Sequence, residues 1–149
     1  AAPAKVSFLA FCTANVLIDI EPLYFMLTHQ DHLHRFFHTY LGDLLVTLAT
    51  VVLFLACQRV ARQVRLPDPF GWQSLGRRAL ALGAATGSAS HIVLDSVMHA
   101  DITPFAPFSD ANPLLRVISL PALHGFCVAC GAVALVVLGI RRLMRRSGN

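Results

Sequence analysis

Four long apolar stretches, at about residues 6–27, 36–57, 79–98 and 118–140, constrain this chain more than any other feature. A helix needs about 20 predominantly apolar residues to cross the hydrocarbon core of a bilayer. Backbone groups in lipid must be hydrogen-bonded within their own segment, so spanning stretches of this kind form α-helices. We therefore predict an all-α integral membrane protein, a four-transmembrane-helix bundle that forms a single transmembrane domain over residues 1–149.

The composition agrees with a membrane location. The 149 residues are 56% hydrophobic and 13% charged, whereas soluble domains carry about 25% charged residues. The third stretch is the weakest of the four because it contains the run GAATGSAS, but small residues let helices approach closely in lipid. The net charge of +4 does not indicate nucleic acid, because the arginines stand in short clusters beside the apolar runs, as is typical of membrane topology.

The distribution of Lys and Arg predicts the orientation. Ten of these residues precede the first stretch, separate the second from the third, or follow the fourth, and only Arg35 and Arg116 lie on the other side. Cytoplasmic loops carry the excess of Lys and Arg, so we expect both termini in the cytoplasm. No cleavable signal peptide is expected, because Asp19 interrupts the first stretch and no clear small-residue cleavage site follows.

Polar residues of all four stretches fall at a similar depth. A rise of about 1.5 Å per residue, counted from each basic flank, gives heights from roughly 20 Å to roughly 31 Å in a hydrocarbon core about 30 Å thick. In order of height, this layer contains His91, Asp19, Asp43, Asp95, His124 and His38. Ionisable residues inside a membrane are costly and usually face the bundle interior or a wet cavity, so the layer predicts a functional site in the outer half.

The residue types in this layer predict a metal site. Histidine and carboxylate mixtures bind zinc or a related transition metal, whereas magnesium and calcium prefer oxygen ligands. In HIVLDSVMHAD, His91 and Asp95 are one helical turn apart. His34 and His38 would also be one turn apart on a helix if the second span begins early enough. Two such pairs and an acidic residue of the first span could bind one or two ions.

The first span contributes its acidic residues from the sequence DIEP. Asp19 and Glu21 would point to nearly opposite faces of a regular helix, but Pro22 disfavours helical geometry at the residue before it. A break at Pro22 could therefore bring both carboxylates toward one cavity. The four cysteines, including the CxxC of Cys127 and Cys130, stand in apolar surroundings and are interpreted as packing residues rather than metal ligands.

Three motifs in order resemble the small inner-membrane metal-dependent hydrolases, a family with a LexA-regulated branch. They are DIE at 19–21, HRFFHT at 34–39 and HIVLDSVMHADITPFAPFS at 91–109. The family shows Asp-x-Asp near the end of its first helix, then HR-x-x-TH, then H-x-x-x-D with a following T, a G and a closing PFS. The resemblance implies a multi-pass protein of the bacterial inner membrane with a metal-dependent hydrolytic site.

Carried over position by position, the resemblance marks residues of all three motifs. They are Asp19, Glu21, His34, Arg35, His38, His91, Asp95 and 107–109. The chain departs from the pattern at Phe37, at Met98 and at Asp101, where the family has Thr, Thr and Gly. His99 and Asp101 are therefore candidate substitute ligands. The implied cofactor is a divalent transition metal, zinc in the first place, with manganese and iron as alternatives.

Two functional interpretations remain open. In the first, the chain is a metal-dependent hydrolase that acts near the outer, periplasmic face on a membrane lipid or lipid-linked phosphoester. The metal lowers the pKa of its water to about 7, Glu21 or Asp101 acts as general base, and Arg35 binds an anionic group. In the second, the chain is a non-enzymatic metal- or haem-binding membrane protein or an accessory subunit. The sequence leaves the oligomeric state open.

Overall fold

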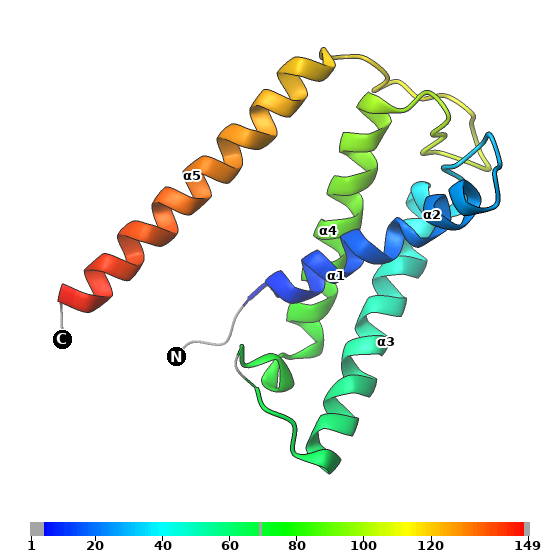
Figure 1. Cartoon of the computed structure of the whole chain (residues 1–149). Helices are drawn as coiled ribbons and strands as arrows, with labels where there is room; N and C mark the ends of the chain where they lie inside the picture. The colour runs from blue at the N-terminus through cyan, green and yellow to red at the C-terminus, as the bar shows by residue number, and fades with distance from the viewer. Residues whose placement is uncertain (1–4, 69, 148–149) are drawn as a thin grey trace. The chain divides into compact units, whose positions relative to one another are not determined.

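A computed structural model describes residues 5–68 and 70–147, and every regular element in this part of the chain is helical. The helices form two compact units, one reaching to Leu115 and the other beginning at Arg116. Figure 1 labels the α-helices. The elements are α1 (Phe8–Ile18), α2 (Ile20–Leu27), η1 (Phe36–His38), α3 (Tyr40–Val64), η2 (Trp72–Ser74), α4 (Arg77–Met98) and α5 (Leu120–Ser147).

Three segments among the described residues are long and apolar enough to cross a membrane. They are Phe8–Leu27, Tyr40–Val64 and Leu120–Met144. The prediction of an all-α membrane protein is thus supported, but the prediction of four apolar spans is wrong in one respect. The stretch at 79–98 does form a helix, α4, but its Gly, Ser, Thr, His and Asp content makes it too polar to qualify by hydropathy.

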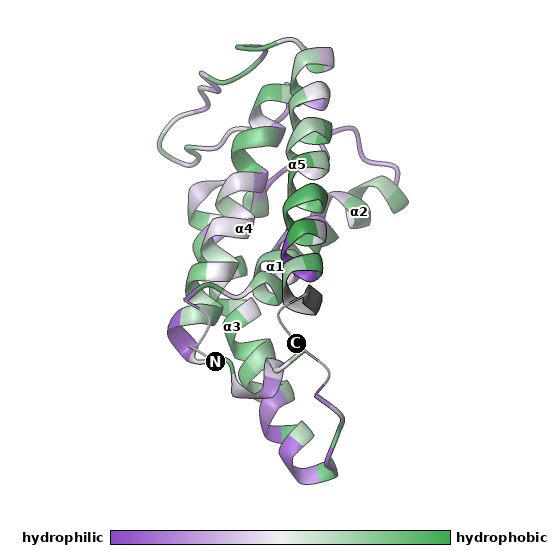
Figure 2. Ribbon diagram, turned by 90° about the vertical axis from the view of Figure 1, so that its left-hand side faces the viewer, coloured by the Kyte–Doolittle hydropathy of each residue, from purple (hydrophilic) through white to green (hydrophobic). Residues whose placement is uncertain are grey.

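The polar composition of α4 suits its position in the first unit, where it packs against both α1 and α3. The middle of α4 is pale in Figure 2, where the neighbouring helices are largely green. A Cβ atom added at Gly83 would lie 2.2 Å from the Ser7 carbonyl oxygen, and one at Gly87 would lie 2.5 Å from that of Phe11. The backbones of α1 and α4 can approach this closely only because these positions are glycine.

The first predicted span is broken at Asp19, one turn before Pro22. Asp19 ends α1, and α2 begins at Ile20 with Pro22 in its first turn. Proline is tolerated in a first turn, but its ring clashes with the carbonyl group four residues earlier, here that of Ile18. The expected break therefore exists, but it precedes the proline instead of coinciding with it, and Asp19 stands at the corner.

The second predicted span, 36–57, begins four residues later than expected and extends further. Thr39 caps α3, because its Oγ1 accepts a hydrogen bond from the Gly42 N–H at 2.9 Å. A Cβ at Gly42 would lie 2.0 Å from the Phe36 carbonyl oxygen, so glycine lets η1 fold back onto the start of α3. His34 and His38 consequently do not share a helix, and the helical spacing expected for them is wrong.

Asp43, another member of the predicted polar layer, links two helices of the first unit. Its carboxylate accepts a hydrogen bond from the Ser88 hydroxyl of α4, and Ser88 also lies 3.4 Å from the Thr47 hydroxyl of α3. Buried polar groups in lipid-facing bundles need such partners. Asp43 therefore stabilises the contact between α3 and α4.

The second unit consists mainly of α5, which contains the candidate span Leu120–Met144. This span matches the predicted stretch 118–140 and extends it by one turn. His124, Cys127 and Cys130 lie on α5, and all four cysteines of the chain are free thiols.

Candidate metal centre

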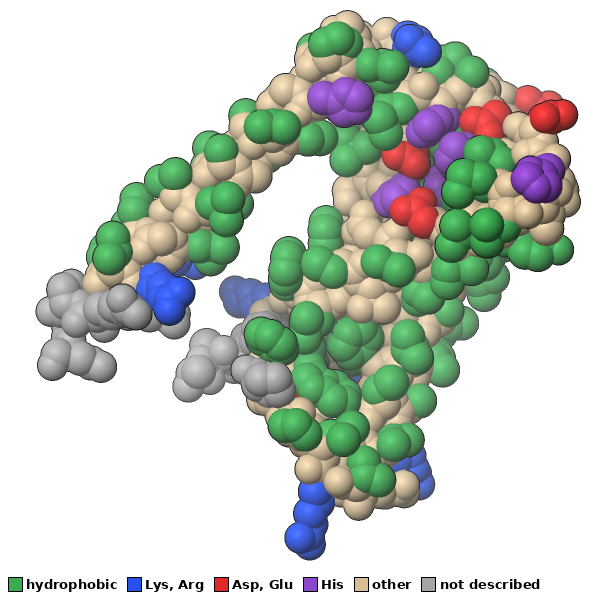
Figure 3. Space-filling view, in the orientation of Figure 1, with side chains coloured by type: hydrophobic (Ala, Val, Ile, Leu, Met, Phe, Trp, Pro, Cys, Tyr) green, Lys and Arg blue, Asp and Glu red, His purple; other side chains and the backbone are tan. Residues whose placement is uncertain are grey.

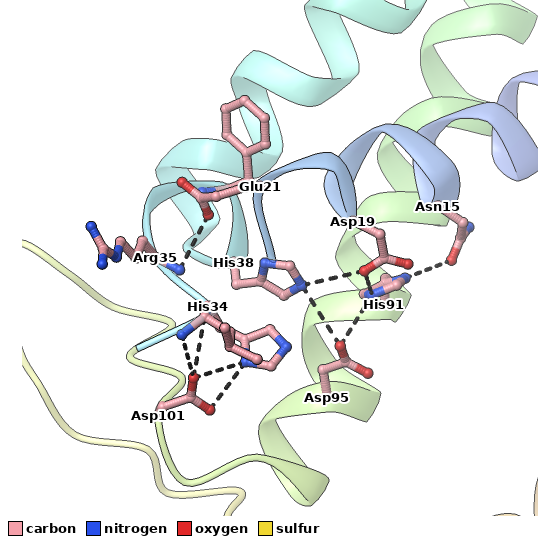
Figure 4. Close-up of polar contacts among 11 residues, drawn as sticks. Asn15, Asp19, Glu21, His34, Arg35, His38, His91, Asp95 and Asp101 are labelled. Carbon is pink, nitrogen blue, oxygen red and sulfur yellow. Dashed lines mark hydrogen bonds and ion pairs between the residues drawn. The ribbon is translucent and has the colours of Figure 1, made fainter. Parts of the chain in front are cut away.

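Four side chains of the first unit meet where α1, η1 and α4 come together. Asp19 stands at the end of α1, His38 ends η1, and His91 and Asp95 lie one turn apart on α4. Each offers one ligand atom, and the four atoms lie within 4.8 Å of one another. Figure 4 shows the four side chains pointing toward a common point. We call Asp19, His38, His91 and Asp95 the first group.

The distances within the first group match those of a metal coordination shell. His91 Nε2 lies 3.1 Å from both Asp19 Oδ1 and Asp95 Oδ2. His38 Nε2 lies 3.8 Å from Asp19 Oδ1 and 3.6 Å from Asp95 Oδ2. Ligands placed about 2.1 Å from a tetrahedral zinc ion are separated by about 3.4 Å. The four atoms are therefore spaced as ligands of one ion are.

Three of the four histidine nitrogens of the first group lack hydrogen-bond partners among the described residues. His38 is fully buried, yet neither of its ring nitrogens has a partner, and His91 Nε2 has none either. The contacts of His91 with Asp19 and Asp95 are short enough for ion pairs but lack the direction of hydrogen bonds. Buried polar atoms are almost always hydrogen-bonded or bound to a metal. The first group therefore has the donor set and the unpaired atoms that a metal ion requires.

Asn15 on α1 fixes the tautomer of His91. The Asn15 Nδ2 donates a hydrogen bond to the Phe11 carbonyl oxygen at 2.9 Å, which leaves Oδ1 as the acceptor for His91 Nδ1 at 3.1 Å. His91 then carries its proton on Nδ1 and presents a lone pair at Nε2, toward Asp19 and Asp95. Metal-binding histidines usually donate their second N–H to a neighbouring oxygen in this way.

The charge of the first group also favours a cation. Two carboxylates meet in this group, and the side chain of Asp95 is only 14% exposed. Like charges at this separation and burial repel one another strongly. A divalent ion would neutralise the pair, which makes the group a site that could hold a metal ion.

A second group, formed by His34, His99 and Asp101, lies beside the first. Its ligand atoms also lie within 4.8 Å of one another. His34 Nδ1 is 3.0 Å from both carboxylate oxygens of Asp101. The His34 ring contacts the rings of His99 and His38, with centroids 4.5 Å and 4.7 Å away. His34 therefore connects the two groups.

The loop backbone holds Asp101 in place. Its Oδ2 accepts hydrogen bonds from the backbone N–H groups of Leu33 and His34, both at 3.2 Å. Burial raises the pKa of Asp101, but these N–H groups and the His34 ring outweigh that effect and lower the pKa to about 2. Burial lowers the pKa of His34, and the Asp101 carboxylate opposes this only in part. The pair thus favours a carboxylate beside a neutral imidazole at neutral pH.

Two predicted site residues, Glu21 and Arg35, lie outside both groups. Glu21 accepts hydrogen bonds from three successive backbone N–H groups, those of Arg35, Phe36 and Phe37, at 2.9–3.2 Å. The Arg35 guanidinium stacks over the Phe25 ring at 3.7 Å and donates to Gln30. Figure 4 shows the Arg35 side chain directed away from the first group. Asp19 and Glu21 therefore do not reach one cavity, and Glu21 shapes the loop that positions His34 and His38.

Both groups face one pocket of about 470 Å³ in the first unit. Asp19 and Asp95 of the first group and His34 and His99 of the second line it. The rest of its wall is apolar and consists of Val16, Ile20, Pro22, Leu23, Met26 and Leu33. Figure 3 shows acidic and histidine side chains of this unit gathered beside hydrophobic ones at the end that carries α2.

Sequence reasoning missed Asn15. The sequence spacing could have identified this residue. Asn15 precedes Asp19 by four residues and so shares its face of the first helix. An amide one turn from a candidate ligand is a natural partner for a metal-binding histidine.

Comparison with known proteins assigns no family. No protein-family model, curated protein or solved structure matches the chain. The resemblance to the inner-membrane metal-dependent hydrolases therefore remains a prediction that stands on the three motifs, and the geometry of the two groups is the basis for the proposals below.

Proposed function

We propose that this protein is a membrane-embedded, metal-dependent hydrolase that binds its metal through Asp19, His38, His91 and Asp95. The observation that carries the proposal is the convergence of four ligand atoms from α1, η1 and α4. Among the described residues, both ring nitrogens of His38 and the Nε2 of His91 have no hydrogen-bond partner. Zinc suits this set of two imidazoles and two carboxylates, and manganese and iron accept the same ligands.

The pocket beside the metal ligands supports a catalytic role for the metal rather than simple metal storage. A bound divalent metal supplies a water molecule of lowered pKa and polarises the scissile group of the substrate. Asp19 is 53% exposed at its side chain and lines the pocket together with Asp95, so a substrate can reach the ligand shell. Asn15 holds the His91 ring in orientation. With four protein ligands, the catalytic water would have to join as a fifth ligand, and catalytic zinc ions do expand to five-coordinate.

The apolar wall of the pocket supports a lipid as substrate. Leu23 and Met26 of α2 and Val16 of α1 lie beside Asp19 and are about half or more exposed. An acyl or prenyl chain would lie along these side chains, while its ester or phosphoester group reaches the metal ligands. A membrane lipid or lipid-linked phosphoester has this combination of an apolar chain and a hydrolysable head.

We further propose a multi-pass protein of the bacterial inner membrane whose site faces the periplasm. The apolar segment formed by α1 and α2 (Phe8–Leu27) and the helices α3 and α5 would span the bilayer. The helix α4 would span it as the fourth segment, shielded by α1 and α3. The excess of Lys and Arg on one side supports cytoplasmic termini.

The test is turnover by purified, zinc-loaded protein offered phosphoester, ester and amide lipids. We expect hydrolysis that a chelator abolishes and added zinc restores. His91→Ala should lose this hydrolysis together with the metal of the first group. His32→Ala is the matched control, because His32 is an exposed histidine of the neighbouring loop that belongs to neither group. Metal-loaded protein that hydrolyses none of these lipids would favour a metal-binding or accessory protein instead.

A further inference from the structure

The second group has the composition of a metal site in its own right. His34, His99 and Asp101 supply two imidazoles and a carboxylate within 4.8 Å of one another, a donor set that binds zinc, manganese or iron. A simple His34–Asp101 ion pair would not require His99, whose ring lies 4.5 Å from that of His34.

These three residues do not share one helix. Contacts from different segments of the chain bring them together. His99 is the C-terminal cap of α4, and its N–H donates to the Asp95 carbonyl oxygen at 2.8 Å. His34 is buried, and Asp101 holds its segment through two backbone N–H groups. Asn112 donates to the backbone carbonyl of Ser96 at 2.9 Å and so ties the following loop to the end of α4.

The two groups are neighbours that open to the same space. The His34 ring contacts the His38 ring of the first group at 4.7 Å. Asp19, Asp95, His34 and His99 all line the same pocket. Hydrolases that act on phosphoesters often hold two metal ions about 3.5–4 Å apart, where the ions stabilise both the attacking and the leaving oxygen.

We propose that His34, His99 and Asp101 bind a second divalent metal ion, so that the pocket contains a two-metal centre. This inference rests on the proposed function, because it adds a second ion to the first group's site. His99 and Asp101 stand at or near positions where the chain departs from the hydrolase motifs, so the second site is a property of this chain's own residues.

The charge of such a centre matches an anionic substrate. Asp19, Asp95 and Asp101 contribute three negative charges, and two divalent ions contribute four positive charges, which leaves a net charge of +1 when the histidines are neutral. A positive centre beside an apolar wall favours the phosphate of a lipid phosphoester over the neutral ester of a diacylglycerol.

Manganese binding to the full chain in detergent tests the second site without relying on activity. We expect two Mn²⁺ ions per chain by titration, with an electron paramagnetic resonance spectrum of a coupled pair. His99→Ala and Asp101→Asn should each reduce the stoichiometry to one and leave the spectrum of an isolated ion. His32→Ala should keep two ions, and circular dichroism should show unchanged helical content in each variant.

The other outcomes separate this proposal from the first. One ion in the unmodified chain, lost in His91→Ala and kept in His99→Ala, would overturn the second site and leave the proposed function standing. Two ions in both His99→Ala and Asp101→Asn would also overturn it, because these residues would not be ligands. Failure of the unmodified chain to bind Mn²⁺ or Zn²⁺ at all would overturn both proposals.

Discussion

At the scale of single residues, the main finding is that His91 is oriented from a different helix. Asn15 Oδ1 on α1 accepts a hydrogen bond from His91 Nδ1 on α4, and Asn15 Nδ2 donates one to the Phe11 carbonyl oxygen. The lone pair of His91 Nε2 is thereby directed at the carboxylates of Asp19 and Asp95. The metal affinity of the first group should therefore depend on a residue that is not itself a ligand.

Replacement of Asn15 by alanine tests this dependence. We expect the metal affinity to fall about 10- to 100-fold, because the His91 ring loses the partner that sets its tautomer and orientation. Asn15→Asp should retain most of the affinity, since a carboxylate also accepts a hydrogen bond from the Nδ1–H group. Competition with a chelator of known affinity would measure both.

Thr13→Val is the matched control for that experiment. The Thr13 hydroxyl bonds to the Leu9 carbonyl oxygen of its own helix, and Thr13 lies outside both groups. Equal affinities for Asn15→Ala and Thr13→Val would contradict the role assigned to Asn15.

The sequence predicts the metal ligands better than it predicts the residues and turns that position them. Counting the helical rise from each basic flank placed Asp19, His91 and Asp95 at a similar depth, because the rise per residue of a helix is constant. His38 reached the same site from a 3-10 turn, which depends on the Thr39 cap and on Gly42. Glu21 looked like a ligand because it is acidic and near Asp19, but its partners are backbone N–H groups, which no side-chain pattern reveals.

At the scale of elements, close packing of α1 against α4 sets the geometry of the first group. Asn15 and Asp19 come from α1, and His91 and Asp95 come from α4, so their separation depends on the distance between the two helices. Glycine at position 83 permits the required approach, because any Cβ there would overlap the Ser7 carbonyl oxygen.

Gly83→Ala should therefore destabilise the protein and weaken metal binding together. Overpacking of a tight contact costs about 1–3 kcal/mol, which should appear as a melting temperature lower by several degrees in detergent. Gly76→Ala is the control, because a Cβ at that position meets no atom within 4 Å. If the two variants melted at the same temperature, the close contact between α1 and α4 would not be a significant source of stability.

The helix α4 also explains why four spans were predicted and three were found. Hydropathy measures what a helix would expose to lipid, but the buried positions of α4 include Gly83, Gly87, Ser88 and Ser96. These residues face neighbouring helices of the first unit, where small and polar side chains are favourable. A helix of this kind is recognised from its packing rather than from its mean hydropathy.

At the scale of the whole molecule, the proposed topology requires α4 to cross the membrane. The loop before α4 and the loop after it would then lie on opposite sides. Ser74 ends η2 in the segment before α4, and Ser109 lies in the loop after α4. Both are exposed and carry small side chains that a cysteine can replace.

Cysteine labelling in intact cells checks this topology, in a chain whose four native cysteines are replaced by alanine. A membrane-impermeant thiol reagent should label Ser109→Cys from outside and should label Ser74→Cys only after the membrane is permeabilised. Labelling of both positions from the same side would show that α4 does not cross, and the reverse pattern would invert the orientation inferred from Lys and Arg.

The central claim, that the first group binds a metal through imidazole and carboxylate, is tested most directly by zinc K-edge X-ray absorption of the purified, zinc-loaded protein. The account predicts a shell of nitrogen and oxygen ligands at about 2.0–2.2 Å, together with the outer-shell signature of imidazole. In His91→Ala, the zinc of the first group should be lost, so that only zinc held by the second group still contributes to the signal. A sulfur shell at about 2.3 Å would contradict it, because the metal would then be held by cysteines such as Cys127 and Cys130 instead of Asp19, His38, His91 and Asp95.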